Sequence, residues 1–124
     1  MQAMNNPNCE VRELISRAGM SSFFPMSTAY IGSKDPLYPS EVVPLNDIEP
    51  FVRGVGVPNF NERRALYILD TICNNTPLPP VRAYGFANSP YKYQLFDGFH
   101  RYHISIALGF TEIPVGINPW KPET

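Results

Sequence analysis

A glycine, a histidine and an arginine stand close together between two apolar segments near the end of the 124-residue sequence, in the run LFDGFHRY at 95–102. We expect a strand to lead into this glycine, Gly98, and a helix to begin directly after it. Backbone N–H groups at a helix N-terminus point outward, and the helix dipole adds partial positive charge there. Gly98 leaves room for a ligand near the backbone, while His100 and Arg101 add side-chain donors. The run therefore predicts an anion site, most naturally for a phosphate.

Two carboxylates could add chemistry to this site, and each also has a plain structural explanation. Asp97 is placed to bind magnesium or an accepting hydroxyl group, but it could instead cap the following helix. Glu49 could act as a general base near a phosphate, but it could equally be a solvated turn residue. In the structural alternative for the whole run, the chain makes a tight strand-to-helix turn, and His100 and Arg101 are only exposed.

Composition and charge exclude several classes of protein. Hydrophobic residues make up 44% of the chain and aromatic residues 13%, which argues against disorder. Ten basic against eleven acidic residues give a net charge of −1, so DNA binding by this chain alone is not expected. The two cysteines, Cys9 and Cys73, are too far apart to suggest a metal site or a disulfide framework. We recognise no signal peptide and no membrane span of about 18 apolar residues, and we expect a cytoplasmic protein.

The elements that must position the candidate residues are short. Prolines number 14 of 124, well above the ordinary share of about 5%, and they punctuate the chain between apolar segments. Asn61 is the expected cap of a helix, and Pro114 suggests that the last strand lies at a sheet edge or carries a bulge. Apolar patterning predicts helices at 9–18, 62–74 and 102–108, and strands at 41–45, 80–86, 91–96 and 113–117.

The order of these elements predicts a small α+β domain, of mixed α/β character, with a mixed sheet and packed helices. We expect three parts in the chain. Residues 1–40 form an N-terminal extension with a short helix and an apolar irregular segment, residues 41–117 form the folded domain, and residues 118–124 form a C-terminal tail.

Two stretches resemble the signature of the ParB/sulfiredoxin superfamily, FDGFHRY at 96–102 and ALGFTEIPV at 107–115. This superfamily includes the N-terminal domain of ParB partition proteins, the sulfiredoxins and a group of free-serine kinases. Upstream, VPLNDIEP at 43–50 is similar to its first strand and turn, and residues 66–75 are similar to its first helix. The resemblance covers about residues 41–117 and implies a ParB/sulfiredoxin-like domain that binds a nucleotide.

The resemblance also assigns binding residues. In these families, phosphates are cradled by the turn that here consists of Gly98, Phe99, His100 and Arg101. Sulfiredoxins use a lysine and a threonine on the preceding helix for ATP, and the matching positions here are Arg64 and Thr71. Arg64 keeps the charge of the lysine but not its shape. Tyr67 stands where that family has a serine at the next contact position, so nucleoside recognition must differ.

Departures from the family patterns separate its activities. Phe99 stands where sulfiredoxins carry their catalytic cysteine, and phenylalanine is no nucleophile, so sulfiredoxin activity is not expected. ParB proteins have a Gly-Glu-Arg-Arg turn and a downstream helix-turn-helix, for which the sequence leaves no room after the last predicted strand, so partition by this chain alone is not expected. The Asp-Gly-x-His-Arg form most resembles the free-serine kinases. Their catalytic glutamate follows the proline of the first strand, whereas Glu49 precedes Pro50 and Val52 stands near the matching place.

Two functions remain open from the sequence. In the first, the chain uses ATP or another nucleotide with magnesium to phosphorylate a small hydroxyl compound, and Asp97 or Glu49 serves the metal or the acceptor. In the second, the chain is a non-catalytic binding or regulatory module, which could form a homodimer. The expected partner is a nucleotide or a phosphorylated small molecule. We do not expect the chain to associate with a membrane.

Overall fold

The structure is a computed structural model that describes residues 7–49, 61–87 and 90–119. Its helices are α1 (Pro7–Arg17), α2 (Glu62–Cys73) and α3 (Phe99–Leu108), and a short 3-10 helix, η1, spans Leu45–Asp47. Its strands are β1 (Ser40–Pro44), β2 (Ile48–Glu49), β3 (Val81–Tyr84), β4 (Tyr93–Asp97) and β5 (Glu112–Asn118). All the predicted helices and strands are present with shifted bounds, and β2 was not predicted. The predicted tail beyond Pro119 lies outside the described residues.

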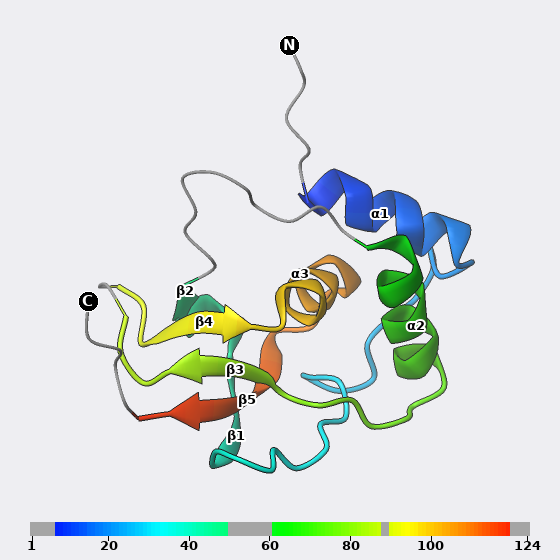
Figure 1. The fold of residues 1–124 in the computed structure, drawn as a ribbon. Helices are drawn as coiled ribbons and strands as arrows, with labels where there is room; N and C mark the ends of the chain where they lie inside the picture. The colour runs from blue at the N-terminus through cyan, green and yellow to red at the C-terminus, as the bar shows by residue number, and fades with distance from the viewer. Residues whose placement is uncertain (1–6, 50–60, 88–89, 120–124) are drawn as a thin grey trace.

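The strands form one mixed sheet in the order β1-β5-β3-β4-β2. Two neighbouring pairs, β1 with β5 and β3 with β4, are antiparallel, while β3 with β5 and β2 with β4 are parallel. Figure 1 shows α1, α2 and α3 grouped together, with α3 following directly on the end of β4. This arrangement confirms the predicted α+β domain. Among the described residues, no helix has both the length and the apolar character needed to cross a membrane.

Pro114 lies in an interior strand, so the prediction of an edge strand or a bulge at this residue is wrong. β5 runs between β1 and β3, and its register shows no shift at the proline. Pro114 is paired with Val42 of β1, whereas the pairing with β3 begins one residue later, at Val115. The proline therefore stands just before the β3 ladder starts, where its missing N–H is tolerated.

The segment between α1 and β1 is bonded to the rest of the domain through its backbone. The carbonyl of Ile31 accepts from the N–H of Leu78 at 2.9 Å, and the N–H of Ser33 donates to the carbonyl of Leu78 at 2.8 Å. Further along, the carbonyl of Pro39 accepts from the N–H of Ile117 at 2.9 Å. These bonds hold the segment against the residues that precede β3 and against β5. It can therefore contribute side chains to a site in the domain.

Candidate functional site

A groove of about 430 Å³ lies where α2, the start of α3, β3 and the segment between α1 and β1 approach one another. We call it the arginine groove because three guanidinium groups line it. Its complete lining is Asp35, Pro36, Arg64, Tyr67, Ile68, Leu78, Pro79, Pro80, Arg82, Asp97 and Arg101. Three residues that the sequence predicts for the site, Arg64, Asp97 and Arg101, meet here. The rest of the lining is two acidic and several apolar side chains, so the groove is both charged and hydrophobic.

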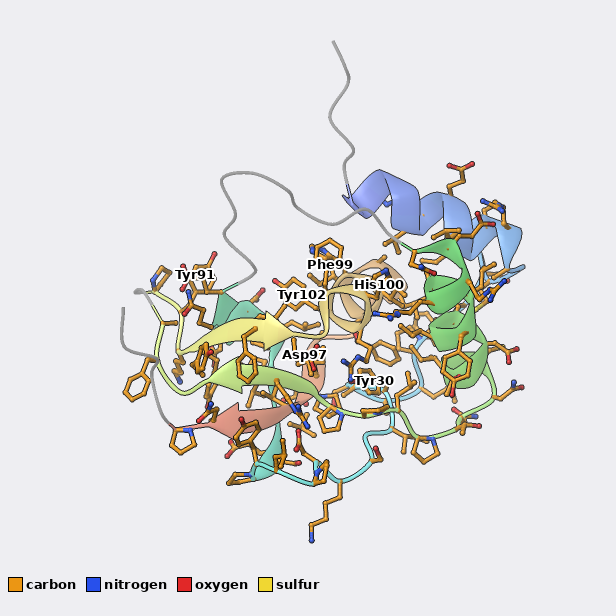
Figure 2. The ribbon with its side chains drawn as sticks, in the orientation of Figure 1. Tyr30, Tyr91, Asp97, Phe99, His100 and Tyr102 are labelled. Carbon is orange, nitrogen blue, oxygen red and sulfur yellow. The ribbon has the colours of Figure 1, made fainter. Side chains whose placement is uncertain are left out.

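The turn from β4 to α3 depends on Gly98. This residue is the N-cap of α3 and has a φ of 109°, a conformation that side chains other than glycine strongly disfavour. A Cβ atom at this position would lie 2.6 Å from Cγ1 of Val81 in β3. The helix begins at Phe99, earlier than predicted, and no side chain caps it, so Asp97 is not the N-cap. Figure 2 shows Asp97 and His100 at this junction of β4 and α3.

Arg101 joins the first turn of α3 to the segment before β3. Its Nη1 donates to the carbonyl oxygens of Pro79 and Pro80 at 2.8 and 2.9 Å. Its Nη2 lies 3.9 Å from Oδ2 of Asp97, and the carboxylate of Asp97 is 55% exposed. Because a guanidinium carries five N–H donors, Arg101 can hold this segment and still present donors to the groove.

Arg64 supplies the second helix-borne charge. It lies in the first turn of α2, which begins as predicted, with Oδ1 of Asn61 accepting from the N–H of Arg64 at 2.9 Å. Arg64 is exposed, and among the described residues its guanidinium has no hydrogen bond or ion pair. The guanidinium is therefore available to an anion in the groove.

His100 connects the turn to the start of α2. Its Nε2 accepts a hydrogen bond of 2.8 Å from the backbone N–H of Asn61, so Nε2 carries no proton and the ring is neutral. Burial lowers the pKa of His100, and the positive charges of Arg64 and Arg101 lower it further. A phosphate contact from this side chain would therefore have to use the other ring nitrogen. The same pKa shift indicates that both arginines bring their charge to one place.

Five of the eight predicted site residues do not line the groove. Gly98 and His100 belong to the turn described above, and the other three are Thr71, Phe99 and Glu49. Thr71 is buried, and its hydroxyl donates to the carbonyl of Tyr67 one turn earlier in α2, at 2.7 Å. Phe99 packs its ring in the core, 4.7 Å from the ring of His103. Glu49 is buried in β2, next to Gln94 in the register of β4. The turn thus brings Asp97 and Arg101 to Arg64, while these three side chains lie elsewhere.

Sequence reasoning missed an ion pair that forms one wall of the groove. Nε of Arg82 lies 3.0 Å from Oδ2 of Asp35, and the side chain of Asp35 is only 2% exposed. Oδ1 of Asp35 also accepts from the N–H groups of Leu37 and Tyr38, at 2.7 and 3.1 Å. Burial alone would raise the pKa of Asp35, but the bonds from Arg82, Leu37 and Tyr38 together lower it. No motif marks Asp35, because its partner Arg82 is 47 residues away in the chain.

Acid is expected to destabilise the fold through His103, which lies against the rings of Phe99 and Tyr102. Burial, followed by the nearby His100, lowers the pKa of His103 to about 4. In the unfolded chain the His103 imidazole takes up a proton near pH 6.5, whereas in the folded chain it does so only near pH 4. The free energy of unfolding is therefore unaffected by this residue above pH 6.5 and decreases as the pH falls toward 4. We expect a loss of about 2 kcal/mol between pH 7.5 and 5 from this residue. Urea unfolding at several pH values measures it.

The matched variant for this prediction is His103→Phe, which keeps an aromatic ring and removes the titration. Its free energy of unfolding should change less between pH 7.5 and 5 than that of the unmodified protein. Equal pH dependence of the two proteins would show that His103 is not responsible.

Comparisons with known proteins identify the fold. Neither family models nor curated proteins match this sequence. Among solved structures, the C-terminally truncated chromosome-partitioning protein ParB from Caulobacter crescentus complexed with CTP-gamma-S has a TM-score of 0.53 and 16% identity, over 67% of this chain and 46% of that chain. The same protein complexed to the centromeric parS site has a TM-score of 0.50 and 14% identity, over 65% and 40%.

Sulfiredoxin from Arabidopsis thaliana aligns with a TM-score of 0.48 and 21% identity, over 64% of this chain and 83% of that chain. The present chain spans less than half the length of the two ParB chains. At such low identities the comparisons concern the fold and not the activity. The similarity to ParB over about two thirds of this chain therefore gives it a ParB/sulfiredoxin-like fold.

Proposed function

We propose that this chain binds a nucleotide or another phosphorylated small molecule in the arginine groove. The observation that carries the proposal is the meeting of Arg64 and Arg101, from two different helices, in one groove. The lowered pKa of His100 supports it, because both charges act on the same ring. A ParB structure with this fold is complexed with CTP-gamma-S, which makes a nucleotide the first ligand to test.

The charges of the groove suggest how phosphates would be held. Arg82 is paired with the buried Asp35, which leaves Arg64 and Arg101 as the main cations and Asp97 as the exposed anion. Guanidinium groups match phosphate oxygens in geometry and in charge. A nucleoside triphosphate carries more negative charge than two arginines offset. A magnesium ion, held by the phosphates and by Asp97, would supply the remaining positive charge.

For catalysis, we propose that Asp97 serves the metal or the accepting hydroxyl group, because it is the acidic residue of the groove that is exposed. In this reaction the terminal phosphoryl group would pass from the nucleotide to the hydroxyl oxygen, and the hydroxyl proton would pass to a carboxylate. Glu49 was the second candidate, and its position in β2 keeps it out of the groove lining.

The second candidate function is a non-catalytic binding or regulatory module. It is favoured by the positions of Glu49 and Thr71, neither of which lines the groove. The two functions share the binding site and differ in turnover. To distinguish the two functions, the protein is incubated with ATP, magnesium and a panel of small hydroxyl compounds, and phosphoryl transfer is followed by phosphorus NMR. Transfer that disappears in Asp97→Asn supports the enzyme, whereas binding without transfer supports the module.

Binding itself is tested by isothermal titration with ATP, ADP and CTP, with and without magnesium. Arg64→Ala is expected to lower the affinity for the nucleotide about 10-fold, because it removes a charge-assisted hydrogen bond. The fold should remain intact, because residue 64 is exposed. The matched control is Arg63→Ala, a neighbouring exposed arginine that does not line the groove. The proposal is wrong if none of the nucleotides binds at millimolar concentration, or if the two variants behave alike.

A further inference from the structure

We propose that Tyr67 is the stacking platform for the base of a nucleotide in the arginine groove. This inference rests on the proposed function and deepens it. It predicts that the groove prefers a nucleotide over an inorganic phosphate of the same charge, because only the nucleotide has an aromatic base.

Tyr67 projects from α2 without being used in the core. Its residue surface is 65% exposed, whereas its neighbours Ile68 and Leu69 are buried at 4% and 0%. Among the described residues, no aromatic ring contacts the ring of Tyr67. A single exposed aromatic residue is ordinary on a protein surface. The position of Tyr67 in the lining of a charged groove is the feature that needs an explanation.

The position of the ring matches what a nucleotide requires. Tyr67 follows Arg64 by three residues, so both side chains lie on one face of α2, about one helical turn apart. Helical side chains tilt toward the N-terminus, which directs the ring of Tyr67 toward Arg64. In a nucleotide, the ribose likewise separates the base from the first phosphate. α2 therefore presents a cation for the phosphates and a flat apolar surface for the base to the same groove.

The other walls of the groove favour a flat ligand as well. Pro36 and Leu78 line it, and the segment that carries Pro36 is bonded to the backbone of Leu78. Pro36 and Leu78 thus add apolar surface to the groove that the ring of Tyr67 also lines. Stacking tolerates any base because every base has a π-face, so this arrangement selects nucleotides as a class and favours the larger purines.

The experiment compares ADP with inorganic pyrophosphate, both with magnesium, by isothermal titration. Both ligands carry a diphosphate, and only ADP carries a base. Tyr67→Ala should lower the affinity for ADP about 10-fold and leave the affinity for pyrophosphate unchanged. Tyr67→Phe should bind ADP with an affinity within about 2-fold of that of the unmodified protein. Phe24→Ala, an exposed aromatic residue outside this groove, is the matched control and should change neither affinity.

The stacking proposal is overturned if Tyr67→Ala lowers the affinities for ADP and pyrophosphate equally, or changes neither affinity. In both cases the phosphate site still stands if Arg64→Ala weakens both ligands. Absence of binding by the unmodified protein to either ligand overturns the proposed function, and the stacking with it. CDP adds a graded readout, because a smaller base should bind more weakly than that of ADP and should lose less on Tyr67→Ala.

Discussion

Gly98→Ala is expected to lower the free energy of unfolding by about 3 kcal/mol, because two separate costs fall on one residue. The backbone has a φ of 109°, which strains any residue with a Cβ atom. The new Cβ would also lie 2.6 Å from Cγ1 and 3.1 Å from Cα of Val81. Since backbone atoms of β3 are involved, the clash cannot be relieved by a side-chain rotation alone. Urea denaturation measures the loss.

Gly109→Ala is the matched control for this prediction. Gly109 ends α3 with a φ of 96°, but the nearest atom to its added Cβ is Cγ of Pro25, at an ordinary 3.5 Å. This control therefore has the strain without the clash and should lose only about 1 kcal/mol. Equal losses in the two variants would show that the packing on Val81 is unimportant. Because Gly98 sets the start of α3, its variant should also weaken nucleotide binding through Arg101.

Asp35→Ala is expected to lower the free energy of unfolding by about 3 kcal/mol, because it leaves the charge of Arg82 without its partner and removes an acceptor from two backbone N–H groups. Asp35→Asn keeps an oxygen for the N–H groups of Leu37 and Tyr38 and should lose less, about 1 to 2 kcal/mol. Urea unfolding of both variants separates the ion pair from the backbone bonds.

Asp47→Ala provides the control for the ion pair. Asp47 lies 3.7 Å from Lys92 in a pair whose side chains are 26% and 69% exposed, so its loss should cost less than about 0.5 kcal/mol. Similar losses for Asp35→Ala and Asp47→Ala would contradict the structural role of the buried pair. Gly116→Ala should imitate Asp35→Ala, because a Cβ at Gly116 would collide with the carboxylate of Asp35.

Much of the turn and of α2 could be predicted because the determining residues are neighbours in sequence. Asn61 caps α2 through the N–H of a residue three positions later, and Gly109 ends α3 in the left-handed conformation. The same local reasoning misjudged Pro114 and left out β2, because neither the order of strands nor a two-residue parallel pair is encoded in local spacing.

The sequence by itself predicted every α-helix and every strand except β2, since helix periodicity, caps and turn glycines act over a few residues. The glycine turn pointed to Asp97 and Arg101, and the superfamily resemblance pointed to Arg64. Only the tertiary structure decided which side chains meet. His100 reaches across 39 residues to the start of α2, and Asp35 across 47 residues to Arg82. The physical reason is that such contacts depend on the order of the strands in the sheet and on which segment packs beside them. Both are determined by burial and strand pairing between residues that are far apart in the sequence.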